Sequence, residues 1–149
     1  MSGKGDRHRL FSYLEKRFGI SRHDFDDYLL FKKRKSWWIL KESPLIGQIT
    51  HLKVWRVGFK AFQEVGQFIK PTTRMIQLFG PRASKARLDI NEGVFRSLAK
   101  GDVIRADMGI DNGYVILSIK GMVLGLGLLI DGAIRSQIPK KEIRFFVLT

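Results

Sequence analysis

Two apolar runs near the C-terminal end of the chain are each followed by a short turn signal. Residues 114–119 lead to Lys120 and Gly121, and residues 122–130 lead to Asp131 and Gly132. Such pairs are typical of tight hairpins, because glycine and aspartate tolerate positive φ angles. The pattern predicts consecutive antiparallel strands. The second run is apolar on both faces, so we expect it to be the central strand.

The tripeptide Asp-Asn-Gly at residues 111–113 is a further turn signal before the first run. We expect a hairpin there, so that the sheet extends over residues 113–139. Gly125 and Gly127 are two positions apart in the central strand and therefore point to one face. Glycines in this arrangement either let a backbone or ligand approach closely or relieve crowding where a small barrel bends. The sequence leaves both interpretations open.

The N-terminal part of the chain has helical periodicity. Apolar residues recur at helical spacing between Arg7 and Phe18, and Gly19 offers a C-terminal stop. We therefore predict a helix over residues 7–18. Ser21 is a suitable N-cap for a second helix, which we expect to extend to Leu29.

A basic run at residues 32–35 leads into Trp37 and Trp38, which predict a strand. One interpretation is a phosphate-contacting loop beside a base-stacking surface, because lysine and arginine neutralise phosphates and flat aromatic rings stack on bases. The other is a solvated turn next to core tryptophans. Alternation over residues 49–56 predicts a further strand.

Short helices and strands are predicted to alternate in the middle of the chain. Pro71 opens a helix that Gly80 closes, and a short strand follows at residues 88–90. Asn91 is expected to cap a helix that ends at Leu98. The sheet described above then begins after this helix.

The charge of the chain points to a polyanionic partner. The 149 residues include 27 Lys+Arg and 14 Asp+Glu, for a formal net charge of +13 and a pI near 10.3. Such an excess attracts polyanions, and it is greatest over residues 51–100. Nucleic acid fits better than a membrane surface, because no apolar run could span a bilayer and no basic amphipathic helix stands out.

Candidate catalytic chemistry is sparse. The sequence has no cysteine, which excludes disulfides, thiolate catalysis and cysteine-ligated zinc. His8, His23 and His51 lack metal-ligand spacing, so we expect no metal. Gly125 and Gly127 are not followed by the third glycine or the helix of a dinucleotide fingerprint, so we expect no cofactor. No carboxylate pair suggests acid–base catalysis.

With no apolar signal segment at the start, we predict a cytoplasmic protein without enzymatic activity or a membrane partner.

Several segments between residues 57 and 144 together resemble a known family. They read, in order, FIKPTTRMIQLFG, SKARLDI, LAKGD, NGYVILSIKGMVLGLGL and SQIPKKEIR. They are similar to the PUA-like region that accompanies Sun-type RNA cytosine-C5 methyltransferases and, more loosely, to PUA domains of ribosome-biogenesis proteins. The resemblance implies a small pseudo-barrel of antiparallel strands with short helices that binds structured RNA.

The expected fold is therefore α+β, with an N-terminal α/β unit followed by a PUA-like antiparallel β pseudo-barrel with short helices. We place an N-terminal domain at residues 1–66 and the PUA-like domain at residues 67–149. A Sun-type enzyme also needs a domain for S-adenosylmethionine and a cysteine nucleophile. These 149 residues contain neither, so we expect no methyltransferase activity from them.

The resemblance and the charge pattern together indicate an RNA surface made of cations near a concave edge and of glycines that allow close backbone approach. Each candidate also has a structural interpretation; Lys100, for example, could complement a helix C-terminus. The candidate RNA-binding residues are Lys70, Thr72, Arg74, Lys85, Arg87, Lys100, Gly101, Gly125, Gly127, Lys140, Lys141 and Arg144.

The leading hypothesis is a non-catalytic protein that holds structured RNA, either tRNA or rRNA, during RNA modification or ribosome biogenesis. The alternative is an adaptor whose tryptophans Trp37, Trp38 and Trp55 dock a separate RNA methyltransferase or ribosome-assembly factor. Exposed tryptophans would favour the adaptor, and burial of all three would weaken it.

Overall fold

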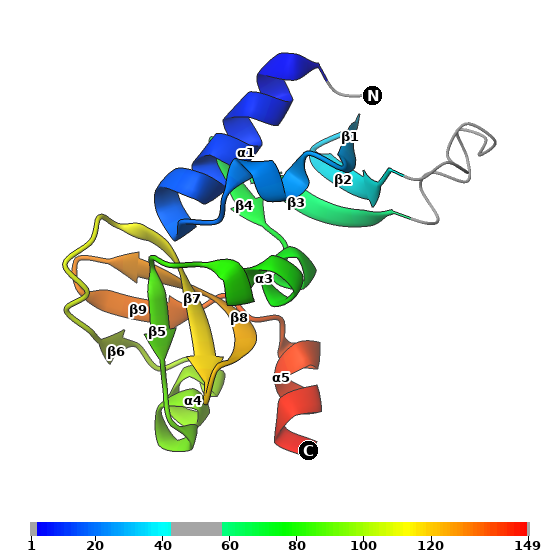
Figure 1. The fold of residues 1–149 in the computed structure, drawn as a ribbon. Coiled ribbons are helices and arrows are strands. Elements are labelled where there is room, and N and C mark those ends of the chain that lie inside the picture. The colour runs from blue at the N-terminus through cyan, green and yellow to red at the C-terminus, as the bar shows by residue number, and fades with distance from the viewer. Residues whose placement is uncertain (1–2, 43–57, 149) are drawn as a thin grey trace.

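The computed structural model describes residues 3–42 and 58–148 and contains two β-sheets with helices around them (Figure 1). The first sheet is antiparallel and has the order β1-β2-β3-β4. Its strands are β1 (Tyr28–Lys33), β2 (Ser36–Lys41), β3 (Phe59–Val65) and β4 (Phe68–Pro71). The second sheet has the order β5-β7-β8-β9-β6. Its strands are β5 (Arg87–Asp89), β6 (Ile104–Arg105), β7 (Gly113–Ile119), β8 (Met122–Ile130) and β9 (Ala133–Ser136).

Helix α1 (Lys4–Phe18) confirms the first predicted helix. Its buried residues Leu10, Leu14 and Phe18 share one face, because three and four residues make about one helical turn. The helix ends as predicted at Gly19, whose φ of 67° lies in the left-handed region.

The predicted second helix is wrong beyond its first turn. Ser21 does cap a turn, but only the short 3₁₀ segment η1 (Arg22–Phe25) follows. Tyr28 already belongs to β1, which pairs with β2 along its whole length, from Tyr28 opposite Lys41 to Lys33 opposite Ser36. This ladder satisfies the backbone groups of β1 that face β2, and a single capping bond does not outweigh it.

The basic run lies at the β1–β2 turn, where Arg34 has a φ of +58°. Trp37 and Trp38 lie on β2, as predicted, and point to opposite faces of the sheet. The predicted strand at residues 49–56 lies outside the described residues.

In the second sheet, the turns at Lys120-Gly121 and Asp131-Gly132 both have positive φ angles, between 49° and 81°. They join β7 to β8 and β8 to β9 as antiparallel hairpins, and β8 is the central strand, so these predictions are confirmed. The edge strand β5 differs from the expected all-antiparallel arrangement, because it runs parallel to β7.

The hairpin predicted at residues 111–113 is wrong. Strand β6 pairs with β9, so the connection to β7 passes β8 and β9 instead of turning back on itself. Residues 111–113 do bend the chain, but they do not pair the strands on either side of them, because β6 pairs with β9. Ile104 of β6 faces Ile134 of β9, which is completely buried.

Four short elements complete the fold: α3 (Thr73–Phe79), η3 (Gly80–Arg82), α4 (Glu92–Ala99) and α5 (Lys140–Leu148). Asn91 caps α4 as predicted, with its side chain accepting from the Val94 N–H at 2.8 Å. Pro71 does not open α3: it ends β4, and Thr72 is the cap. No helix in the described part of the chain has the length and apolar character needed to cross a bilayer.

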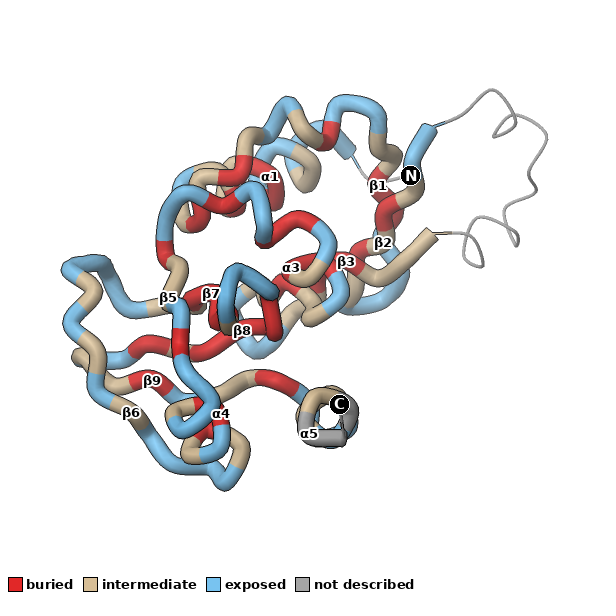
Figure 2. Tube along the Cα trace, turned by 60° about the horizontal axis from the view of Figure 1, so that its bottom comes forward, coloured by how far each residue is buried: buried red, intermediate tan, exposed pale blue. Residues whose placement is uncertain are grey.

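A continuous core joins the two sheets. Figure 2 shows buried positions along α1, β7 and β8. The Phe25 ring of η1 stacks on Phe11 of α1 with centroids 4.5 Å apart, and it lies 4.7 Å from Phe79 of α3. The α+β class with a PUA-like pseudo-barrel is confirmed. The division at residue 66 stays a prediction; the β3–β4 turn lies at this position.

Candidate nucleic-acid interface

A groove lies between α1, the β3–β4 turn and the loop that leads into β7. It consists of two adjoining hollows of about 700 and 720 Å³, which share Tyr13, Arg17 and Asn112. We call it the α1 groove. Its lining includes Arg9, Tyr13, Lys16, Arg17, Phe68, Lys85, Asp111, Asn112 and Tyr114.

Helical periodicity explains why three residues of α1 face the groove. Arg9, Tyr13 and Lys16 follow one another at intervals of three and four residues, so they lie on one flank of α1 beside its core-facing residues. The core contacts of α1 therefore fix which side chains face the groove.

The groove is electropositive. Its lining carries four basic side chains and a single carboxylate, that of Asp111. Lys16 and Lys85 are exposed and make no ion pair with any described residue. Arg9 is half exposed and lies 3.4 Å from Asp6. Lys16 and Lys85 are therefore the positive charges of the groove that remain available to an anion.

Arg17 holds the loop that closes the groove. Its Nε donates to the Tyr114 carbonyl at 2.7 Å, and its Nη1 donates to the Asp111 carbonyl at 2.8 Å. Its Nη2 is buried without a hydrogen-bond partner among the described residues. A Cβ at Gly113 would lie 3.2 Å from the Arg17 Cζ, and the φ of Gly113 is +145°. Glycine therefore lets the guanidinium pack under the loop.

Two tyrosines provide the aromatic part of the groove. Burial raises the pKa of Tyr13 to about 12, against a smaller opposing effect of Arg17, and burial also raises the pKa of Tyr114. Both hydroxyls consequently stay protonated at neutral pH and can donate hydrogen bonds. The Tyr13 ring also packs edge-on against Phe18, with centroids 5.9 Å apart, which fixes its orientation.

The rim of the groove combines a cation with exposed apolar side chains. The Lys70 Nζ lies 5.9 Å from the centre of the Tyr114 ring, and partial burial lowers the pKa of this lysine. Phe68 is 72% exposed and Ile130 is 52% exposed. Flat aromatic surface next to cations is the combination that stacks bases and neutralises phosphates.

Comparison with known proteins identifies a relative of the part of the chain that forms the second sheet. Residues 85–144 match the family described as the methyltransferase RsmF PUA domain. This part of the chain is a PUA-like domain of that kind. The resemblance drawn from the sequence is thereby confirmed. The matched range contains β5 to β9 and α4, together with the beginning of α5.

A longer relative extends this likeness to the N-terminal part. The chain is 26% identical over 140 residues to the ribosomal RNA small subunit methyltransferase F of Psychromonas ingrahamii. The match covers 91% of this chain but only 28% of the relative. The chain thus spans little more than a quarter of that methyltransferase.

Four of the candidate RNA-binding residues have structural roles in or beside the PUA-like domain. The Thr72 hydroxyl caps α3 and donates to the Lys60 carbonyl at 2.7 Å. Arg87 donates to the Ala83 carbonyl at 3.0 Å. Gly125 and Gly127 are buried, and a Cβ on them would lie 2.9 Å from Ile138 and 2.8 Å from Ile134, respectively. These two glycines therefore relieve crowding, in agreement with the second interpretation above.

The remaining candidates fall into separate places. Lys85 lies in the α1 groove and Lys70 at its rim, whereas the Arg74 guanidinium lies 5.8 Å from the Phe59 ring of β3. The candidates that follow α4 and those of α5 lie toward the end of the molecule away from α1 (Figure 1). This distant group comprises Lys100, Gly101, Lys140, Lys141 and Arg144. The structure thus brings two of the predicted cations, Lys85 and Lys70, to the α1 groove.

Sequence reasoning missed the contribution of α1 to the groove. The spacing of the apolar residues predicts the helix that carries Arg9, Tyr13 and Arg17, but no local pattern indicates that this helix lies against the loop before β7. The available signal was the amphipathic pattern itself, whose flank beside the core face carries these side chains.

Trp37 does not offer a stacking surface. Trp37 is completely buried, and its Nε1 donates to the Asp6 carboxylate at 3.1 Å, so it belongs to the core. Trp38 is half-buried. Trp55 lies outside the described residues. Within the described ranges, no three His, Asp or Glu side chains gather as a metal site would require.

The raised pKa of Tyr13 predicts a pH-dependent stability. Above pH 10 the unfolded chain loses the Tyr13 proton while the folded chain keeps it, so unfolding becomes more favourable as the pH rises toward 12. We expect Tyr13 to account for a loss of about 2 kcal/mol in the free energy of unfolding between pH 9 and pH 11.5. Urea unfolding of the wild type and of Tyr13→Phe at both pH values measures this difference. Identical pH dependence in the two proteins would contradict burial of the hydroxyl.

Proposed function

We propose that this protein binds structured RNA, either rRNA or tRNA, through the α1 groove and performs no bond chemistry itself. The proposal rests on one observation. The α1 groove is lined both by exposed lysines without an ion pair among the described residues, Lys16 and Lys85, and by the partly buried Tyr13 and Tyr114. The PUA-like domain and the relative, a ribosomal RNA small subunit methyltransferase, support an RNA partner in RNA modification or ribosome biogenesis. We place this activity in the cytoplasm.

Binding begins with electrostatic capture. The net charge of +13 draws the phosphate backbone toward the protein. Lys16, Lys85 and Arg9 then neutralise phosphates and release counterions. These contacts orient the RNA without reading its sequence.

Shape and stacking follow capture. Structured RNA presents unstacked bases at loops, bulges and stem ends, and aromatic side chains can stack on them. The Tyr114 ring and the exposed Phe68 ring offer such faces in the α1 groove, while Arg17 keeps the adjoining loop in place. The groove is therefore suited to a stem end with a splayed base.

The test is the salt dependence of RNA binding. We expect about three phosphate contacts, from Lys16, Lys85 and Arg9, so the logarithm of the association constant should fall with the logarithm of salt concentration with a slope of about −2 to −3. Fluorescence anisotropy with a labelled small-subunit rRNA hairpin, a tRNA transcript and unstructured polyuridine measures it. Tighter binding of the folded RNAs supports shape recognition. A slope near zero, or equal affinity for polyuridine, would overturn the proposal.

A second function rests on the exposed apolar rim. Phe68 and Ile130 leave apolar surface in contact with water beside the groove, as a protein-docking site does. In this alternative the protein is an adaptor for an RNA methyltransferase or a ribosome-assembly factor acting in trans. Of the three tryptophans named for this alternative, Trp37 is buried, Trp38 is half-buried and Trp55 lies outside the described residues, so the version that relies on them stays a prediction. The adaptor predicts weak RNA binding in the anisotropy assay, with no preference for folded RNA.

A further inference from the structure

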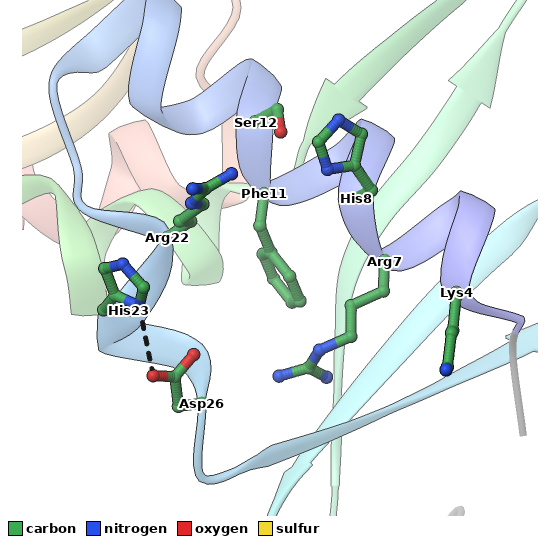
Figure 3. A pocket seen from close by; sticks show the side chains of 8 residues that line it. All are labelled: Lys4, Arg7, His8, Phe11, Ser12, Arg22, His23 and Asp26. Carbon is green, nitrogen blue, oxygen red and sulfur yellow. Dashed lines mark hydrogen bonds and ion pairs between the residues drawn. The ribbon is translucent and has the colours of Figure 1, made fainter.

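A second basic hollow lies on the other flank of α1. It has a volume of about 240 Å³ and is formed by the first turns of α1 and by η1 with the residues around it (Figure 3). We call it the α1–η1 pocket. Lys4 and His8 line it and are one helical turn apart, and they face away from the flank that carries Arg9 and Tyr13. The pocket and the α1 groove are therefore separate sites.

The floor of the pocket holds a fixed positive charge. The Arg7 guanidinium lies 5.1 Å from the centre of the Phe11 ring. Its Nη1 donates to the Tyr28 carbonyl at 2.6 Å, and its Nη2 donates to the Phe25 carbonyl at 2.5 Å. Neutral carbonyls orient the guanidinium without cancelling its charge, so Arg7 makes the floor electropositive.

The walls add two cations, and the Glu15 carboxylate accepts from the Arg22 backbone N–H at 3.0 Å, not from the Arg22 guanidinium. Lys4 and Arg22 are exposed, and neither side chain makes an ion pair or a hydrogen bond with another described residue. The one carboxylate in the lining, Asp26, lies 3.2 Å from His23 Nδ1. Figure 3 shows the Arg7 and Arg22 side chains on the two sides of Phe11. Three cations thus surround one small space whose lining carries a single carboxylate, that of Asp26.

The size and the donors together select the ligand. Pockets for whole drug-sized ligands begin at roughly 300 Å³, so this hollow takes a smaller group. Guanidinium and ammonium groups bind phosphate strongly, because its several oxygens accept charge-assisted hydrogen bonds. We propose that the α1–η1 pocket binds a phosphate group, either free phosphate or the terminal phosphate of an RNA. The site does not depend on RNA binding in the α1 groove.

The first test uses inorganic phosphate and the full chain. Titration followed by two-dimensional amide NMR should shift the backbone N–H signals of Ser12, Arg22 and His23. The double variant Lys4→Gln with Arg22→Gln should raise the phosphate dissociation constant by about tenfold. It removes two charged hydrogen-bond donors, and each contributes less than a buried donor because water competes with phosphate for it. Both side chains are exposed, so the variant should fold.

The matched control removes the same charge from the other flank. Lys16→Gln with Lys85→Gln should leave the phosphate dissociation constant unchanged. Equal weakening in both double variants, or no shift of the three amides in the wild type, would overturn the proposal. If phosphate does not bind in the α1–η1 pocket but RNA binding is intact, the proposal for the α1 groove still stands. The two proposals can therefore fail independently.

A third arm identifies the source of the phosphate. If the ligand is the end of an RNA, the variant with both Gln substitutions at Lys4 and Arg22 should bind a 5′-phosphorylated hairpin more weakly than the wild type does. The same hairpin with a 5′-hydroxyl should bind both proteins equally. If inorganic phosphate binds and neither hairpin distinguishes the proteins, the pocket serves free phosphate.

Discussion

Replacing Lys16 and Lys85 by glutamate should weaken the binding of a structured RNA by about 100-fold at moderate salt. Both lysines are exposed in the α1 groove and lack an ion pair within the described residues. Each charged hydrogen bond to phosphate contributes about 1.5 kcal/mol, and 1.4 kcal/mol corresponds to tenfold in affinity. The slope of the logarithm of affinity against the logarithm of salt concentration should also become shallower by about 1.5, because two phosphate contacts are lost. Anisotropy titrations at several salt concentrations measure both quantities.

A matched variant carries the same change of charge elsewhere. Lys140→Glu with Lys141→Glu reverses two exposed lysines in the first turn of α5, where acidic residues complement the helix dipole. We expect the RNA affinity of this variant to fall by less than about threefold, from the change in net charge alone. If the α5 variant loses as much affinity as the groove variant, the RNA surface lies elsewhere or binding is diffuse.

Replacing Phe25 by alanine should have the largest effect on folding. The Phe25 ring is completely buried and packs between Phe11 of α1 and Phe79 of α3, with an edge contact to Tyr28 at 6.2 Å. Alanine would leave a cavity where these elements meet, and we expect a loss of about 3–5 kcal/mol in the free energy of unfolding. Denaturation by urea, followed by circular dichroism, measures this loss.

The control for this variant removes the same ring at an exposed position. Phe68→Ala deletes a side chain that is 72% exposed, so the free energy of unfolding should change by less than about 0.5 kcal/mol. Comparable losses in the two variants would mean that Phe25 does not hold the core together.

The local elements were predictable where a short pattern decides them. Gly19 ends α1 and Asn91 caps α4, because each terminus depends on a few neighbouring residues. The segment that contains Tyr28 was not predictable in this way, because its strand exists through pairing with β2. The same holds for β6, whose partner β9 lies about thirty residues further along the chain.

The candidate site was only partly predictable for a related reason. Lys85 and Lys70 could be proposed from charge and resemblance, and the structure places both at the α1 groove. Arg87 looked equally suitable in the sequence, but its guanidinium binds the Ala83 carbonyl. Whether a cation is free depends on the acceptors around it, and these come from other elements.

By itself, the sequence determined the strongly basic character, the glycine-bearing hairpins around β8, the PUA-like class and the absence of cysteine chemistry. The charge and the absence of cysteine follow from composition, the hairpins from residues close together in the chain, and the PUA-like class from a family resemblance over several segments. Only the tertiary structure decided that Tyr13 and Arg17 lie next to Tyr114, about a hundred residues away. It also decided that the space beside Gly127 is occupied by the Ile134 side chain and is not open to a ligand. The physical reason is that distant contacts are set by the packing of whole elements, which no local pattern encodes.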